Sequence, residues 1–317
     1  MGYSVLIVGA GQLGSRYLQG LSKVSMPLDI IVSDISPESL ARAEIRWQEV
    51  VGHNTRHHVR YVVGLSEVPA EVEVAIIATL ADVRAAAVEQ LTELSAVRYW
   101  VLEKVLAQSL NELIAIQTAI CNGSSVWVNT PMYMWTLYSN IRNKYINKYP
   151  IEASFEGFAG LACNAIHYID FVSRWNKSFP ISINTKGLQN QWYPAKRINF
   201  FEVYGELLID FNDGSKLKLS SNPGDIDYRV NLKVNNDEWH VFESEGMANS
   251  SDGKIIDGKC DYQSQLTAPL VESIIQNGYC DLPTISESIV QHKIFLVSLL
   301  EHWNQCMPNK LDRLPIT

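Results

Sequence analysis

The most constraining feature of this chain is a glycine-rich turn near its N-terminus. An apolar run, Val5–Val8, leads directly into Gly9-Ala-Gly11-Gln-Leu-Gly14, and Asp34 stands twenty residues after the last glycine, at the end of a second apolar run, Leu28–Ser33. A strand, a G-x-G-x-x-G turn, a helix and a second strand that ends in a carboxylate are the parts of a dinucleotide-binding βαβ unit. The sequence therefore predicts an α/β nucleotide-binding fold for this region.

Each residue type in the unit has a physical reason. Gly9 allows a tight turn, Gly11 lets a pyrophosphate approach the backbone, and Gly14 lets the following helix pack close to the sheet. That helix directs its N–H groups and the positive end of its dipole at the phosphates. Asp34 can accept both ribose hydroxyls and would repel a 2′-phosphate, and Ile35 follows it with no arginine nearby. We therefore expect NAD rather than NADP.

The composition fits a two-domain protein in the cytoplasm. The chain of 317 residues is too long for one ordinary core, with 47% apolar and 19% charged residues. No run of about 18 apolar residues predicts a membrane span, and no signal-like segment precedes the first strand. The net charge of −8 argues against nucleic-acid binding.

The cysteines and histidines predict no metal site. His57-His58 lacks an acidic or thiol partner nearby and indicates a surface turn. The cysteines are odd in number and scattered without C-x-x-C spacing, which predicts thiols rather than a disulfide frame or a zinc site. They are Cys121, Cys163, Cys260, Cys280 and Cys306.

Strand and helix patterns alternate over the first 130 residues. Ser36 is placed to cap a helix that runs from Pro37 to about Val50. Repeated βα units of this kind require a mostly parallel sheet. The other expected elements are strands over Val72–Thr79, Val97–Leu102 and Ser125–Asn129, a helix over Asp82–Leu94, and a helix opened by the capping box Ser109-Leu-Asn-Glu112.

The pattern changes beyond Thr130. A strand over Ile151–Glu156 and a helix over Leu161–Trp175 precede strands separated by turn sequences. We expect a Rossmann domain over residues 1–129 and an α+β domain with a largely antiparallel open sheet over 130–317. The uncovered face of that sheet predicts a homodimer or higher homo-oligomer. The turns are Asn212-Asp-Gly214, Asn235-Asn-Asp237 and Ser251-Asp-Gly253, and the closing helices cover Gln265–Asn277 and Ser286–Cys306.

Two groups of residues outside the glycine turn can carry chemistry. Glu103-Lys104 follows a parallel strand, at the edge where open α/β sheets bind ligands, and a partly buried lysine there can act on a substrate oxygen. The alternative is an exposed charged pair. His167 and Asp170 share one face of a helix, so Asp170 can support a proton-exchanging His167. The alternative is a solvated face on which Asp170 pairs with Arg174.

These motifs, together with Ala78-Thr79 at a strand end, resemble the glucose–fructose oxidoreductase / inositol dehydrogenase (Gfo/Idh/MocA) family over nearly the whole chain. Arg197–Gly205 and Phe211-Asn-Asp-Gly214 resemble its central sheet strands. The resemblance implies catalytic roles beside the nicotinamide for Lys104, His167 and Asp170. The cofactor-binding residues are then Gly9, Ala10, Gly11, Gln12, Leu13, Gly14, Asp34, Ile35, Thr79, Leu80, Glu103 and Lys104.

The chain departs from the family pattern in several places. Val105 and Leu80 replace prolines, and Cys163 stands where the family often has Asp or Asn. Residues 130–135 read Thr-Pro-Met-Tyr-Met-Trp, where arginines are common, so substrate contacts there would be apolar or aromatic. The family's substrates therefore do not carry over.

The leading hypothesis is an NAD-dependent dehydrogenase or reductase that acts on a sugar or sugar derivative. Two close variants of this reaction are the reduction of an imine and the oxidation of a nucleotide-linked sugar in the same pocket. Trp135, Trp192 and Tyr193 are candidates to stack on a sugar face, or belong to the core. One alternative is a non-catalytic NAD-binding sensor. Another is a hydrolase that uses bound NAD transiently.

Overall fold

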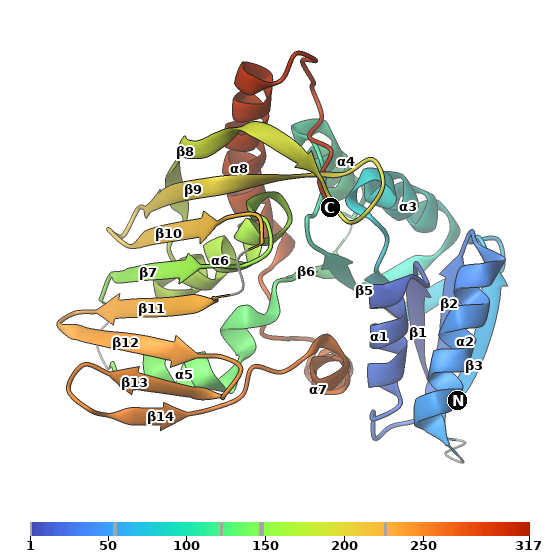
Figure 1. Ribbon diagram of the computed structural model, residues 1–317. Coiled ribbons are helices and arrows are strands. Elements are labelled where there is room, and N and C mark those ends of the chain that lie inside the picture. Colours follow the sequence, from blue (N-terminus) through green and yellow to red (C-terminus); the bar gives the residue numbers. More distant parts are fainter. Residues whose placement is uncertain (1, 53–55, 121–122, 146–148, 225–226) are drawn as a thin grey trace. The chain divides into compact units, whose positions relative to one another are not determined.

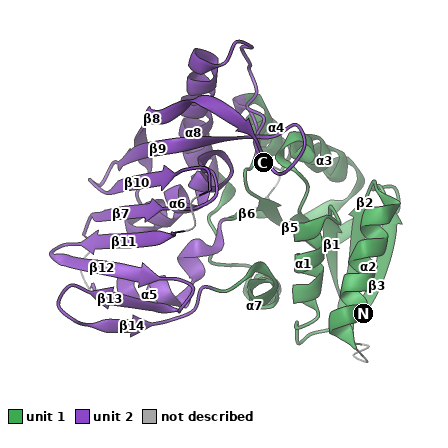
Figure 2. Cartoon of the chain, viewed as in Figure 1, with its two compact units in different colours: residues 1–106, 111–129, 261–285 green, residues 107–110, 130–260, 286–317 purple. Residues whose placement is uncertain are grey.

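The computed structural model describes residues 2–52, 56–120, 123–145, 149–224 and 227–317. The chain forms two compact units (Figure 2). Unit 1 comprises residues 1–106, 111–129 and 261–285, and unit 2 comprises residues 107–110, 130–260 and 286–317. The chain therefore leaves unit 1 for residues 107–110, changes unit again after residue 129, and returns to unit 1 for residues 261–285.

Unit 1 is built on a six-stranded parallel sheet with the order β3-β2-β1-β4-β5-β6 (Figure 1). Strand β1 pairs with both β2 and β4, so the order of the strands reverses at β1. The α/β fold that the sequence predicts is confirmed. The strands are β1 (Tyr3–Val8), β2 (Leu28–Asp34), β3 (His58–Val63), β4 (Glu71–Ile77), β5 (Ala96–Glu103) and β6 (Ser125–Asn129), and the helices are α1 (Gln12–Leu21), α2 (Pro37–Val51), α3 (Ala81–Leu94), α4 (Leu110–Ala119) and α7 (Gln263–Asn277).

The central strands of unit 1 form where the sequence has unbroken apolar runs. Val5, Leu6 and Ile7 of β1 are fully buried, as expected for a parallel strand covered on both faces. The hydroxyl of Ser36 accepts a hydrogen bond of 3.2 Å from the backbone N–H of Ser39. Ser36 therefore caps α2, as the sequence predicts.

The histidine pair does not form a surface turn, so that prediction is wrong. His58 begins β3, and His57 is 8% exposed, with its ring 6.2 Å from that of Trp47. Burial lowers the pKa of His57. Strand β3 lies at the edge of the sheet, where its side chains are only partly buried, so its sequence lacks the apolar run that identifies the other strands.

Helix α7 belongs to unit 1 because it packs directly against α1. A Cβ atom at Gly20 of α1 would lie 2.5 Å from the Cβ of Thr267, so only glycine permits this approach. Glu272 of α7 accepts hydrogen bonds from the backbone N–H (2.6 Å) and the hydroxyl (2.7 Å) of Ser25, just beyond α1. No local sequence pattern in α7 predicts its contacts with Gly20 and Ser25.

Unit 2 is built on an eight-stranded sheet with the order β14-β13-β12-β11-β7-β10-β9-β8. Among the described residues of this sheet, β7 and β10 are the one parallel pair, so the largely antiparallel sheet is confirmed. The strands are β7 (Ile151–Glu156), β8 (Pro180–Pro194), β9 (Phe201–Phe211), β10 (Lys216–Ser221), β11 (Arg229–Val234), β12 (Asp237–Phe242), β13 (Met247–Ser250) and β14 (Ile255–Asp257), and the helices are η1 (Pro131–Met134), α5 (Thr136–Arg142), α6 (Leu161–Asn176) and α8 (Ile285–Cys306).

Helix α6 covers one face of this sheet and carries much of the core of unit 2. It contacts β7, β9 and β10 (Figure 1). The rings of Phe155 and Tyr168 lie 4.4 Å apart, and those of Phe155 and Phe171 lie 5.9 Å apart. The three turn sequences that contain Gly214, Asn235 and Gly253 each connect antiparallel neighbours, as predicted.

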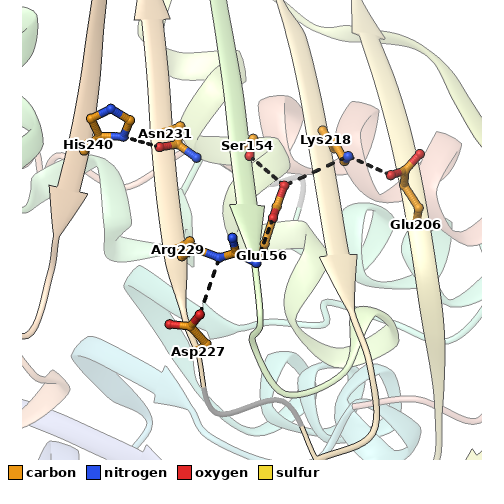
Figure 3. A network of polar contacts seen from close by, with 8 residues as sticks. All are labelled: Ser154, Glu156, Glu206, Lys218, Asp227, Arg229, Asn231 and His240. Atoms are coloured by element: carbon orange, nitrogen blue, oxygen red, sulfur yellow. Dashed lines mark hydrogen bonds and ion pairs between the residues drawn. The ribbon is translucent and has the colours of Figure 1, made fainter. Parts of the chain in front are cut away.

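The opposite face of the sheet is polar, with charges that alternate from strand to strand (Figure 3). Glu156 of β7 lies between Lys218 of β10 (4.0 Å) and Arg229 of β11 (3.6 Å). Lys218 also pairs with Glu206 of β9 at 2.9 Å, and Lys233 pairs with Glu152 at 3.6 Å. Such cross-strand pairs suit exposure to water, so the sheet itself does not require a cover over this face.

Candidate functional site

Two of the three glycines in the turn after β1 are required by the protein's own packing. Gly9 has φ +99°, and a Cβ there would lie 3.0 Å from the backbone of Ala78 and Thr79. A Cβ at Gly14 would lie 1.8 Å from the carbonyl oxygen of Gly9. These glycines hold the start of α1 against the ends of β1 and β4, as the motif predicts.

Gly11 is different, because nothing in the protein requires a glycine at this position. Its φ of −63° is open to any residue, and a Cβ there would have no neighbour within 4 Å. Gly11 is the N-cap of α1, and no side chain caps the helix. A bare helix N-terminus beside a position without a side chain fits a phosphate group.

The carboxylate of Asp34 is tied to the glycine turn. One oxygen accepts a 2.6 Å hydrogen bond from the N–H of Ala10, and the other accepts a 2.8 Å bond from the N–H of Ser36. Each carboxylate oxygen has a further lone pair, so both can still accept a hydroxyl group. Ile35 is 87% exposed and offers an apolar surface next to Asp34.

The other predicted residues of unit 1 lie at the same edge of the sheet. Thr79 and Leu80 follow β4, Glu103 ends β5, and Lys104 comes directly after it. Since β1, β4 and β5 are parallel neighbours, their carboxyl ends place these residues and the glycine turn along one edge. The structure therefore brings together all the unit 1 residues that the sequence singles out.

Glu103 is a buried member of a hydrogen-bond network, so the exposed-pair alternative is wrong for it. The side chain is 2% exposed. One carboxylate oxygen accepts from the hydroxyl of Tyr17 at 2.5 Å and from the amide of Asn129 at 2.6 Å. The Asn129 amide also donates to Gln263 at 2.7 Å. Burial raises the pKa of Glu103, and the hydrogen bonds from Tyr17 and Asn129 act in the opposite direction.

Lys104 occupies the turn that leaves β5. It is half-buried, and the peptide bond that joins it to Val105 is cis. The next two residues, Val105 and Leu106, are fully buried. The charge of Lys104 lowers the pKa of Glu103, but by less than burial raises it.

Arg84 of α3 is a member of this site that the sequence gives no reason to select. Its side chain is 1% exposed and donates to the carbonyl oxygens of Thr79, Val105 and Leu106, the last at 3.1 Å. The guanidinium therefore joins the turn after β4 to the turn after β5. An arginine within a helix usually indicates a solvated face, and this one is buried only because of the tertiary structure.

In unit 2, Asp170 is fully buried, so the solvated-face alternative for α6 is wrong. Its carboxylate accepts from the hydroxyl of Thr130 at 2.8 Å and from the amide of Gln291 at 3.0 Å. Burial raises the pKa of Asp170 to about 6, although the positive charge of Arg174 acts to lower it. His167, one turn earlier on the same helix, is half-buried. Asp170 thus fixes α6 to residue 130 and to α8.

Arginines do reach the segment after β6, although none lies within it. The guanidinium of Arg142 lies 3.9 Å from the centre of the Tyr133 ring, and that of Arg174 lies 4.1 Å from it. Two cations next to one ring form a positively charged group on η1, α5 and α6. The segment itself contains no arginine, but two arginines from α5 and α6 contact its tyrosine.

The three aromatic candidates for stacking on a sugar differ in their surroundings. Trp192 is 3% exposed, and its indole N–H donates to Nδ1 of His302 at 3.2 Å, so it belongs to the core. The hydroxyl of Tyr193 donates to Gln189 at 2.8 Å. Trp135 is half-buried and stacks on Tyr138 with the ring centres 6.1 Å apart.

The described residues contain no group of three or more His, Cys, Asp or Glu side chains that is placed to hold a metal ion. Within the same part of the chain, no helix is long and apolar enough to cross a membrane. Four cysteines are present there as thiols, and Cys121 lies outside the described residues. The four are Cys163, Cys260, Cys280 and Cys306.

Comparison with solved structures shows the same fold in several oxidoreductases. A Gfo/Idh/MocA family oxidoreductase from Vibrio cholerae matches with a TM-score of 0.67 and 14% identity, over 96% of this chain and 99% of that chain. UDP-N-acetylglucosamine 3-dehydrogenase from Acidithiobacillus ferrooxidans matches with a TM-score of 0.69 and 13% identity, over 95% and 97%. The fold that the sequence resemblance implies is therefore confirmed.

A third match was crystallised with ligands. Scyllo-inositol dehydrogenase from Lactobacillus casei, bound to NAD(H) and scyllo-inositol, aligns with a TM-score of 0.66 and 12% identity, over 93% of this chain and 95% of that chain. No protein-family model and no curated protein matches this chain by sequence. At these identities the likeness establishes the fold alone.

Proposed function

We propose that the protein is an NAD-dependent oxidoreductase that transfers a hydride between nicotinamide and a sugar or sugar derivative. The observation that carries the proposal is the open position at Gly11, at the uncapped start of α1. The protein's own atoms do not require a glycine there, whereas a pyrophosphate does. Asp34, bonded to the same turn through Ala10, supplies the acceptor for the ribose hydroxyls.

The residues at the edge of the unit 1 sheet suit the whole cofactor. The glycine turn would hold the pyrophosphate, Asp34 and Ile35 the adenosine, and the segments at Thr79-Leu80 and Lys104 the nicotinamide end. NAD, when bound, supplies the acceptor or donor of the hydride. The carboxylate of Glu103 is already engaged by Tyr17 and Asn129, so its contribution is to fix the position of Lys104.

Lys104 and His167 are the residues that we assign to proton handling. The ammonium group of Lys104 would donate a hydrogen bond to the reacting oxygen and stabilise negative charge on it. The imidazole of His167 would exchange the proton of the reacting hydroxyl group. Asp170 would act indirectly, because its bonds to Thr130 and Gln291 fix the helix that carries His167.

Two observations support the choice of substrate, one for its hydroxylated ring and one for a charged substituent on that ring. The structural neighbours include a UDP-N-acetylglucosamine dehydrogenase and an inositol dehydrogenase bound to scyllo-inositol. The positively charged group around Tyr133 would favour a sugar with an acidic or phosphorylated substituent, which includes nucleotide-linked sugars. An NAD-binding sensor is a second candidate, favoured by Val105 in place of a proline and by the absence of arginines from residues 130–135.

The test is a panel of sugars, sugar acids and nucleotide sugars, incubated with NAD or NADH. Absorbance of the reduced cofactor reports turnover. We expect turnover of at least one hydroxylated ring compound. Tight NAD binding without hydride transfer to or from any compound of the panel would instead support the sensor.

We also propose that the protein is a homo-oligomer, for a reason other than apolar burial. The polar sheet face of unit 2 carries alternating rows of acids and bases and a hollow of about 510 Å³ lined by residues such as Lys216, Lys233 and Glu238. Such rows can pair with those of a second copy. Light scattering of the wild-type protein at micromolar concentration should give a mass at least twice that of one chain. Lys218→Glu should lower this mass. A monomeric wild-type protein would contradict the proposal.

A further inference from the structure

The turns after β4 and β5 border the proposed nicotinamide site, and both lack a stiffening residue. Leu80 and Val105 stand where the sequence resemblance expects prolines. A proline restricts the backbone of a turn in all its states, so its loss leaves a turn with more conformations. Something else must fix these turns if Lys104 is to be held in one position.

Arg84 is the side chain that meets this need. It reaches from the first turn of α3 to the carbonyl oxygen of Thr79, which precedes Leu80. It also reaches the carbonyl oxygens of Val105 and Leu106, which follow Lys104. A planar guanidinium has several donors in a fixed fork, so it can bind acceptors from two segments at once, which the ammonium group of a lysine does poorly.

The charge of Arg84 is balanced within the same network. Its proximity lowers the pKa of the buried Glu103, which Tyr17 and Asn129 also bind. A buried cation that met only carbonyl groups would cost considerable free energy, whereas one near a buried carboxylate costs less. The arrangement therefore keeps an arginine at an enclosed position, where both of its terminal NH groups donate to the backbone of the two turns.

We propose that Arg84 is a positioning residue for Lys104, which takes over the stiffening that prolines would give these turns. This inference rests on the proposed function, because it concerns the placement of the lysine assigned to the reacting oxygen. Arg84 is 1% exposed and contacts the backbone of the two turns. Its effect on the position of Lys104 is therefore exerted through the backbone of residues 79–80 and 104–106. It does not touch the reacting atoms.

The test combines Arg84→Lys with Val105→Pro. Arg84→Lys keeps the charge and removes the fork, and we expect kcat to fall at least about tenfold, with the affinity for NAD changed by less than about threefold. Val105→Pro should restore about two- to fivefold of the lost kcat in the Arg84→Lys background. In the wild-type background it should change kcat by less than about twofold. Arg98→Lys, at an exposed arginine of the same unit, is the matched control.

Equal effects of Val105→Pro in both backgrounds would overturn the proposal, because independent sites act additively. Hydrogen exchange gives a readout that needs no substrate. Arg84→Lys should speed exchange at residues 79–81 and 104–107 at least about tenfold, while β2 is unaffected. A fall in thermal stability with unchanged exchange at these turns would assign Arg84 a purely structural role.

The two proposals fail separately. If the wild-type protein turns over no substrate, the proposed function fails, and the exchange measurement still decides whether Arg84 holds the turns. If Arg84→Lys does not fold, Arg84→Gln, which is uncharged and too short to reach the carbonyl groups of both turns, replaces it in both measurements. Normal kcat with normal exchange in either folded variant would overturn the role of Arg84.

Discussion

The hydroxyl of Tyr17 donates a 2.5 Å hydrogen bond to the buried carboxylate of Glu103, although 86 residues separate them. Tyr17 lies on the helix that follows the glycine turn, and Glu103 ends the strand that leads into Lys104. One bond thus joins the part of unit 1 that would bind the pyrophosphate to the part that carries the proposed catalytic lysine. Burial raises the pKa of Tyr17 well above its usual value, so the tyrosine remains the donor.

Tyr17→Phe should destabilise the protein without altering its fold. A buried carboxylate would lose one of its two donors, and hydrogen bonds to charged groups are worth about 1.5–3 kcal/mol. Denaturant unfolding at neutral pH should show a loss of this size in the free energy of unfolding. Tyr3→Phe, at a tyrosine that is 47% exposed, is the matched control and should change it by less than about 0.5 kcal/mol. Equal losses in both variants would refute the special role of Tyr17.

Asp34 should give the protein a preference for NAD(H) over NADP(H). Its carboxylate would accept the ribose hydroxyls of NAD and repel the 2′-phosphate of NADP. Calorimetric titration should show tighter binding of NAD, and Asp34→Ala should narrow the difference. Since Asp34 also binds the N–H of Ala10, the variant should lose some affinity for both cofactors. Equal affinities for the two cofactors in the unmodified protein would contradict the prediction.

Lys104→Ala and His167→Ala should each lower turnover at least about a hundredfold, because general acid–base help is typically worth about 10²–10⁴-fold. Steady-state kinetics on the substrate found in the panel measures kcat, and calorimetry should show nearly unchanged affinity for NAD. Asp170→Asn should cost less, since Asp170 bonds to Thr130 and Gln291 and supports α6 indirectly. Near-normal turnover in both alanine variants would disprove the catalytic assignment.

Asp170 should make the stability of the protein fall as pH rises from about 4 to about 6. Its pKa is raised by burial from 3.8 to about 6, so in this window the folded state binds a proton that the unfolded state has released. The stability that the protonated form provides is complete below the unfolded pKa and is lost as pH approaches 6. The loss is on the order of 2–3 kcal/mol.

The measurement compares Asp170→Asn with the wild-type protein by denaturant unfolding at several pH values. Asparagine has the shape of aspartate and does not titrate, so the difference between the two free energies of unfolding isolates Asp170. We expect wild-type stability to decrease relative to the variant between pH 4 and pH 6. Parallel curves over that range would show that Asp170 does not titrate as its burial requires.

Local sequence patterns determined much of this protein. The apolar run Val5–Val8, the glycine turn and Asp34 are close along the chain, and their spacing follows from the geometry of one βαβ unit. The turns between antiparallel strands, such as the one at Gly214, are likewise set by a few neighbouring residues. Patterns of this kind identify elements because the backbone preferences that produce them act over short distances.

Contacts between distant segments decided the rest. Helix α7 can approach α1 only because Gly20 faces Thr267. The hydrophobic periodicity of each helix does not predict that the two helices pack together. The sequence pattern gives no reason to single out Arg84, yet its side chain is 1% exposed and donates to the carbonyl oxygen of Val105. Burial and partners of polar side chains depend on which surfaces the folded chain brings together, and this information lies in the tertiary structure rather than in local sequence.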